Sequence, residues 1–147
     1  MKKRSKSIFC CFVYLYICGV SFALADTSQA SEGDLDSQFD LGWRYHKGKG
    51  VKKDDSKAFA LWTAAAKKGH AASQHNLALL YFNGLGVEKN AIEAVNWFRK
   101  AAEPGDSYAQ YNLGVLYAEG KIVPQDYAQA MAWFRKAAVQ GFAPAQT

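Results

Sequence analysis

Cysteine is scarce in this chain, and what there is lies at the start. The three cysteines, Cys10, Cys11 and Cys18, all fall within the first 25 residues. The rest of the chain therefore cannot form a disulfide framework, bind a metal through thiolates or use a cysteine nucleophile. Packing alone must stabilise it, even in an oxidising compartment.

Acidic residues are missing from the same first 25 residues, which carry four basic residues ahead of an apolar run from 8 to 20. A small-residue site, Ala23-Leu24-Ala25, follows that run, as in a secretory signal peptide. The run is about 13 residues long and the hydrocarbon core needs about 20. We expect cleavage after Ala25, a periplasmic or secreted mature chain, and no stable membrane insertion. The alternative is an uncleaved membrane anchor.

Excess charge is missing once this segment is set aside. Subtracting its four basic residues from 18 leaves 14, against 13 acidic residues, or a net charge of +1. A nearly neutral chain has no general attraction to phosphates, so we predict no nucleic-acid partner. The basic run from Lys47 to Lys57 is interrupted by Asp54 and Asp55, which favours a solvated turn over a patch for an acidic partner or anionic glycan.

Catalytic motifs are also missing. The histidines are His46, His70 and His75, and no His-Glu-x-x-His run or Gly-x-Ser-x-Gly elbow is present. Gly84-Leu85-Gly86 lacks the preceding strand and the third glycine of a dinucleotide site, and a helix stop explains it better. We therefore predict no catalytic residue, no cofactor site and no metal site, and histidines with structural or surface roles.

The chain contains a 36-residue unit that occurs three times in succession without a gap. Gln38, Gln74 and Gln110 open the copies, and Gln146 opens a fourth just before the last residue. We assign residues 1–25 to the signal peptide and 26–37 to a polar linker. Residues 38–147 form the repeat domain, with repeats at 38–73, 74–109 and 110–145 and the start of a fourth at 146.

Each copy predicts two helices joined by a glycine turn. In the first copy, Leu41 and Tyr45 lie four apart on one helical face, and Gly48 ends that helix. Asp54 or Asp55 caps the next helix, and Asn90 and Asp126 do so in the later copies. The second helices carry an apolar stripe at i, i+4, i+7 and i+8, beginning at Ala58, Ala94 and Ala130. Pro104 should shorten the helix before Gly105. The sequence predicts an all-α solenoid of three helix-turn-helix repeats, because such pairs bury their apolar faces only when stacked.

The pattern A-x-x-x-L-G-x-x-Y-x-x-G-x-G-V, a capping acid, and A-x-x-W-[FY]-x-K-A-A-x-x-G resembles the Sel1-like repeat family, a relative of the tetratricopeptide repeats. The match is closest over 109–120 and 130–141, and departs at Leu61-Trp62 and Ala64. The resemblance implies a non-enzymatic protein-interaction scaffold, in envelope assembly, polysaccharide secretion or host contact. The alternative is a periplasmic hydrolase of a cell-wall or β-lactam-like substrate, although the cysteine pairs of that subgroup are missing.

The recurring aromatic residues are expected in the core, so the positions where the copies differ are the candidates for a binding site. In tetratricopeptide-like solenoids the first helices line the concave face, where peptides or proteins dock. One face of each first helix varies between copies, which predicts a shallow groove that is polar and mixed in charge in the first repeat and more apolar in the others. Its residues are Asp40, Arg44, Lys47, Asn76, Leu80, Asn83, Asn112, Leu116 and Glu119. The alternative for Asn76 and Asn112 is structural packing between repeats.

The last repeat is followed by no capping helix in the sequence, which leaves an apolar face around Met131 and Trp133. Solenoid ends usually need a polar cap. The alternatives are a longer array of which this is a part, a truncated product, and end-to-end self-association.

Overall fold

The computed structural model describes residues 34–142, and in that range the chain forms six α-helices and no β-strand. Their bounds are α2 Leu35–Lys47, α3 Asp55–Lys67, α4 Ala71–Asn83, α5 Ala91–Ala102, α6 Ser107–Glu119 and α7 Tyr127–Val139. The predicted signal peptide, its cleavage site, the cysteines and the start of a fourth copy lie outside the described residues. No helix within 34–142 is long and apolar enough to cross a membrane.

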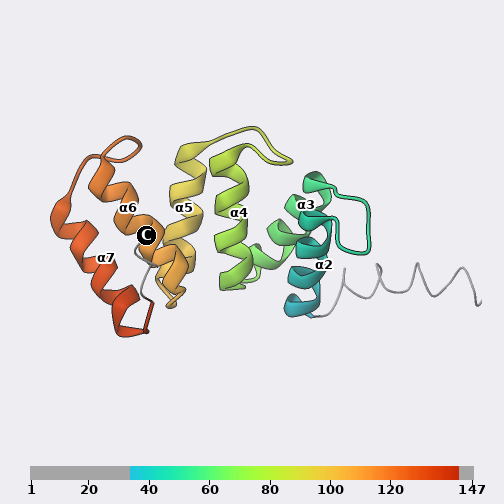
Figure 1. Ribbon diagram of the computed structural model, residues 1–147, viewed down its shortest axis with the longest axis horizontal. Coiled ribbons are helices and arrows are strands. Elements are labelled where there is room, and N and C mark those ends of the chain that lie inside the picture. The colour runs from blue at the N-terminus through green and yellow to red at the C-terminus, as the bar shows by residue number, and fades with distance from the viewer. Residues whose placement is uncertain (1–33, 143–147) are drawn as a thin grey trace, which may run out of the picture. The chain divides into compact units, whose positions relative to one another are not determined.

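The helices alternate between two kinds. We call α2, α4 and α6 the first helices, and α3, α5 and α7 the second helices, of three repeats. Each helix packs substantially against its neighbours in the chain, from α2 on α3 through to α6 on α7, as Figure 1 shows. Contacts between sequence neighbours are the mark of a solenoid. The predicted all-α helical-repeat architecture is confirmed.

The second helices begin at the predicted caps. Asp54, Asn90 and Asp126 have extended backbones, and the side chain of each accepts a hydrogen bond from the amide three residues further on, at 3.0, 3.1 and 3.0 Å. Each bond satisfies an amide that the first turn would otherwise leave free. The helix α5, which precedes Pro104, has 12 residues where α3 and α7 have 13, as expected.

The first helices begin before the glutamines that mark the copies. The helix α2 starts at Leu35, inside the stretch 26–37 that we expected to be a linker, with Asp36 in its first turn. An acid there is favourable at the helix N-terminus. The N-caps of α4 and α6 are His70 and Asp106.

The glutamines lie one turn inside their helices, and two of them join neighbouring repeats. Gln74 and Gln110 are buried, and their Nε2 atoms donate to the carbonyl oxygens of Ala66 and Ala102, at 3.1 and 3.0 Å. Those carbonyls belong to the last turns of the preceding second helices. The glutamines that mark the second and third copies therefore connect each of these copies to the one before it.

Small residues let the second helix of a repeat lie directly on the first. A Cβ atom added to Gly42 would lie 2.4 Å from Nε1 of Trp62, and one added to Gly114 would lie 2.5 Å from Cε1 of Phe134. Trp62 also donates from Nε1 to the carbonyl oxygen of Phe39 at 3.0 Å. Such contacts fix the distance between the paired helices.

The core follows the predicted stripes in the first two repeats. The alanines of both stripes are buried, as are Trp62 and Phe98. In the third repeat Ala130 and Ala137 are buried, but Phe134 is half-buried and Ala138 is exposed. No helix in the described range covers this side of α7, so the apolar face predicted there is open.

Candidate functional site

Three hollows lie along the first helices. The first hollow, of about 460 Å³, is lined by Asp40, Trp43, Arg44, Lys49 and Gly50. The second hollow, of about 280 Å³, is lined by residues that include Trp43, His46, Lys47, Asn76, Leu79 and Asn83. The third hollow, of about 210 Å³, is lined by residues that include Leu79, Phe82, Asn112, Val115 and Glu119.

Neighbouring hollows share a lining residue. Trp43 lines both the first and the second hollow, and Leu79 lines both the second and the third. These two residues occupy the same position in consecutive repeats, and Val115 occupies it in the third. A column of apolar side chains therefore runs across the three first helices and borders adjacent hollows, and we call this row of hollows the first-helix groove.

All nine residues predicted for a partner site line this groove. Asp40 and Arg44 lie in the first hollow, and Asn112, Leu116 and Glu119 in the third. The second hollow holds the remaining four residues: Lys47, Asn76, Leu80 and Asn83.

Two of the nine are not free surface residues. Leu80 is 1% exposed and Leu116 is 6% exposed, so they form the floor of the groove and belong to the core. Their equivalent in the first repeat, Arg44, is exposed. The reason is packing on both sides: α4 and α6 each contact a second helix before and after them, so this position is covered there.

The residues of the apolar column are not among those predicted for the site. Trp43 is 42% exposed, and the Nζ atom of Lys47 lies 5.5 Å from the centroid of its ring. The available signal was spacing, because Trp43 is three residues after Asp40 and four before Lys47, which puts all three on one helical face. The residue at this position also differs between the copies (Trp43, Leu79 and Val115), as it does at the positions that were predicted for the site.

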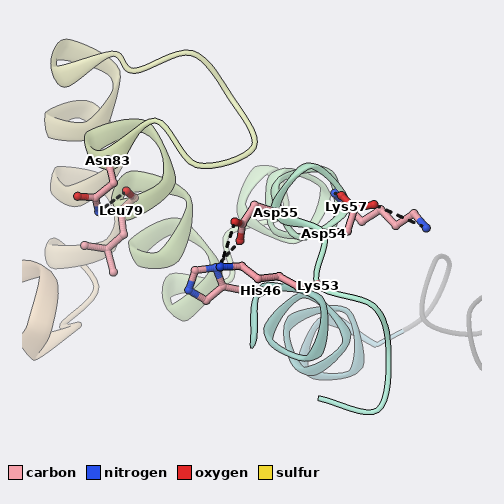
Figure 2. Close-up of polar contacts among 7 residues, drawn as sticks. All are labelled: His46, Lys53, Asp54, Asp55, Lys57, Leu79 and Asn83. Carbon is pink, nitrogen blue, oxygen red and sulfur yellow. Dashed lines mark hydrogen bonds and ion pairs between the residues drawn. The ribbon is translucent and has the colours of Figure 1, made fainter. Parts of the chain in front are cut away.

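The polar wall has both paired and unpaired amides. Asn83 donates from Nδ2 to the carbonyl oxygen of Leu79 at 2.9 Å (Figure 2). Nδ2 of Asn112 lies 3.3 Å from Nε2 of His75, so the structural alternative holds for this asparagine. Within residues 34–142 the Asn76 amide has no side-chain hydrogen bond. The second hollow therefore offers the whole Asn76 amide and the Oδ1 atom of Asn83.

Acids neutralise only part of the basic run in the first repeat. Asp55 is 2.6 Å from Nδ1 of His46 and 3.7 Å from Nζ of Lys53, and Asp54 is 3.8 Å from Nζ of Lys57 (Figure 2). These contacts support the solvated-turn interpretation for that part of the run.

The basic side chains in the groove are different. Arg44, Lys47 and Lys49 form no ion pair with any residue in the described range. At the other end, Glu119 lies 3.5 Å from Nζ of Lys121. The groove therefore has a net positive charge beside α2, where Arg44, Lys47 and Lys49 outnumber Asp40, and carries little net charge beside α6.

The histidines serve contacts between helices. His70 accepts from the Ser73 amide at 3.3 Å and lies 3.0 Å from Oδ1 of Asp36. His75 stacks on Tyr108, and its Nδ1 lies 3.7 Å from Oδ1 of Asp106. Burial lowers the pKa of His75, and the Asp106 charge opposes this in part.

The described residues also show no metal centre. In residues 34–142, no three side chains of His, Cys, Asp or Glu are grouped as a metal site would need. The polar and apolar groups of the groove are suited to non-covalent recognition of another molecule.

Helix pairs stacked in chain order, with a groove along their first helices, define an α-solenoid repeat protein. The Sel1 repeat pattern matches residues 35–70, 71–106 and 107–142. Because these matches cover most of its length, the chain belongs to the Sel1 repeat family. Repeats of this family generally mediate protein–protein interaction and are typically non-catalytic. The matched repeats have the 36-residue period predicted from the glutamines and begin three residues before each of them.

The solved structures that are similar to this chain include two repeat proteins. One is a protective antigen present in uropathogenic Escherichia coli strains, with an SLR fold; it is 41% identical with a TM-score of 0.74, over 77% of this chain and 24% of that one. The other is a Sel1 repeat protein from Oxalobacter formigenes, 40% identical with a TM-score of 0.71, over 74% of this chain and 43% of that one. This chain thus spans less than half the length of either. No curated protein sequence matches it.

Proposed function

We propose that this protein is an exported scaffold that binds a peptide or protein partner in the first-helix groove. The single observation that carries the proposal is the row of adjacent hollows: Trp43 borders the first and second hollows, and Leu79 borders the second and third. A row of hollows across several repeats suits a chain segment that touches each of them.

Export and a role in envelope assembly or host contact are part of the same proposal. The predicted signal peptide supports export. One structural relative is described as a protective antigen of uropathogenic Escherichia coli, which supports a location outside the cytoplasm. The comparisons give no support to a hydrolase.

The test is capture of partners from an envelope extract and from a host-cell lysate with a photo-crosslinking residue at position 43. We expect crosslinked partners that are lost with Phe82→Ala, because Phe82 lines the third hollow. The control is Ile92→Ala, which removes a side chain that is 70% exposed on α5, outside the groove. Equal capture by both variants, with unchanged helicity, would show that the groove is not the partner site.

A second proposal is self-association through α7. Met131 is 51% exposed, whereas Val95, at the same position of the second repeat, is 5% exposed. Ala138 is exposed where its equivalents Ala66 and Ala102 are buried. Sedimentation over a range of concentrations should show association that Met131→Lys prevents. A monomer at every concentration would contradict this second proposal and leave the groove unaffected.

A further inference from the structure

The groove changes its chemistry from one repeat to the next. Where the first repeat has Arg44, the others have Leu80 and Leu116. Where it has Lys47, the others have Asn83 and Glu119. The three cations at the α2 end lack acidic partners in the described range, whereas Glu119 has Lys121. Asp40 lines the same end, so three cations face one acid there, and the surface favours a partner that is acidic at this end only.

The middle of the groove is suited to an extended backbone. The Asn76 amide is unpaired within the described residues, and the Oδ1 atom of Asn83 is free because only its Nδ2 is used. Together they present a donor and acceptors in the second hollow. A helical partner would have satisfied its own backbone groups internally. An extended partner has N–H and C=O groups free to bind these amides.

The far end of the groove is suited to apolar side chains. The third hollow holds about 210 Å³ and is lined by Leu79, Phe82, Phe98 and Val115, with polar groups at Asn112 and Glu119. Pockets for whole small-molecule ligands are usually about 300–1,000 Å³. The third hollow is smaller, which favours one large apolar side chain of a longer partner that continues into the second hollow.

We propose that the partner segment is an extended peptide that places acidic side chains beside Arg44, Lys47 and Lys49 and a large apolar side chain in the third hollow. This inference rests on the proposed function, and adds to it the chemistry and the direction of the segment along the groove. The acidic part lies across α2, the backbone crosses α4 beside Asn76, and the apolar part lies between α4 and α6.

The probe is a phage-displayed dodecapeptide library, selected on the protein purified after export. Selected peptides are then made with a fluorescent label, together with versions in which every Asp and Glu is replaced by Asn and Gln. Binding is measured by fluorescence anisotropy. The charge variant is Arg44→Gln with Lys47→Gln, and its matched control is Lys67→Gln with Lys68→Gln, two exposed lysines at the end of α3 outside the groove.

We expect the selected peptides to combine acidic residues with a large apolar residue separated from them in the sequence. Each exposed ion pair contributes little alone, so the double charge variant should weaken binding about tenfold and the control by less than about twofold. Raising NaCl from about 50 to about 300 mM should weaken binding of the acidic peptide and leave its amide version nearly unchanged, since salt screens exposed charges. Phe82→Ala should weaken binding of both versions.

Three outcomes would overturn the inference, and they separate it from the function itself. Suppose that the selected peptides need Phe82 but contain no acidic residue, or bind the charge variant as well as they bind the unchanged protein. The acidic partner would then be rejected, and the groove would remain a binding site. Peptides insensitive to Phe82→Ala and to the charge variant alike would remove both. A selection without any binder would also remove both.

Discussion

Gly86 lies at the contact between two repeats, which makes Gly86→Ala a direct test of how the repeats are held together. It lies in the turn between α4 and α5 with a φ of +69°. A Cβ atom there would lie 2.2 Å from the carbonyl oxygen of Asp55 and 2.6 Å from the amide nitrogen of Ser56. Both atoms belong to the first turn of α3, in the preceding repeat. The turn of one repeat thus rests on the backbone of another.

Two effects add at this position. Alanine in a left-handed conformation costs about 1–2 kcal/mol wherever it occurs. The contact with Asp55 adds to this, because backbone atoms cannot rotate away as a flexible side chain can. Overpacking of this kind costs about 1–3 kcal/mol. We therefore expect Gly86→Ala to lower the free energy of unfolding by about 2–5 kcal/mol.

Gly69→Ala is the matched control. Gly69 also has a positive φ, +90°, but a Cβ atom there would meet nothing within 4 Å. Gly69→Ala should therefore lower the free energy of unfolding only by the cost of the left-handed conformation, about 1–2 kcal/mol. Urea unfolding followed by circular dichroism gives both values, with an unchanged slope showing that the unfolded state is comparable. Equal losses for the two variants would refute the close approach of the repeats at Gly86.

Three further predictions follow from single contacts. Burial lowers the pKa of His75, so near and below its ordinary pKa of 6.5 the folded chain binds fewer protons than the unfolded chain. The contribution of neutral His75 to stability should therefore be complete above pH 6.5 and fall as the pH drops below that value. His75→Phe, which introduces the residue type found at the equivalent position 39, should flatten this pH dependence in urea midpoints measured at several pH values. Asn90→Ala should lower stability by about 1 kcal/mol through loss of the cap, and Asn96→Ala, an exposed change within α5, by less than half of that in the same assay. Trp62→Phe removes the donor to the Phe39 carbonyl and should lower the thermal unfolding temperature, by an amount that corresponds to about 1–3 kcal/mol; an unchanged temperature would show that this hydrogen bond is not needed.

Much of the local structure was readable from spacing alone. The caps at Asn90 and Asp126, the glycine stops and the alanine stripes were all predicted, because each depends on residues within one or two helical turns. The solenoid followed from the 36-residue period, since the same apolar stripe three times implies the same packing three times. The nine predicted residues of the proposed site could be placed on one face of each first helix, because residues three or four apart lie on the same side of a helix.

The features that required the structure all depend on contacts between repeats. In the sequence Gln74 only marks the second copy, whereas in the structure it holds the last turn of the preceding helix. Leu80 was expected at the surface, and it is buried because α4 has a second helix on each side. Trp43 and Leu79 are 36 residues apart and become neighbours along one groove only when the repeats stack. Helical period and capping are properties of a few adjacent residues, whereas a groove is a property of how separate helices are placed, and that placement comes from close contacts such as Gly86 on Asp55.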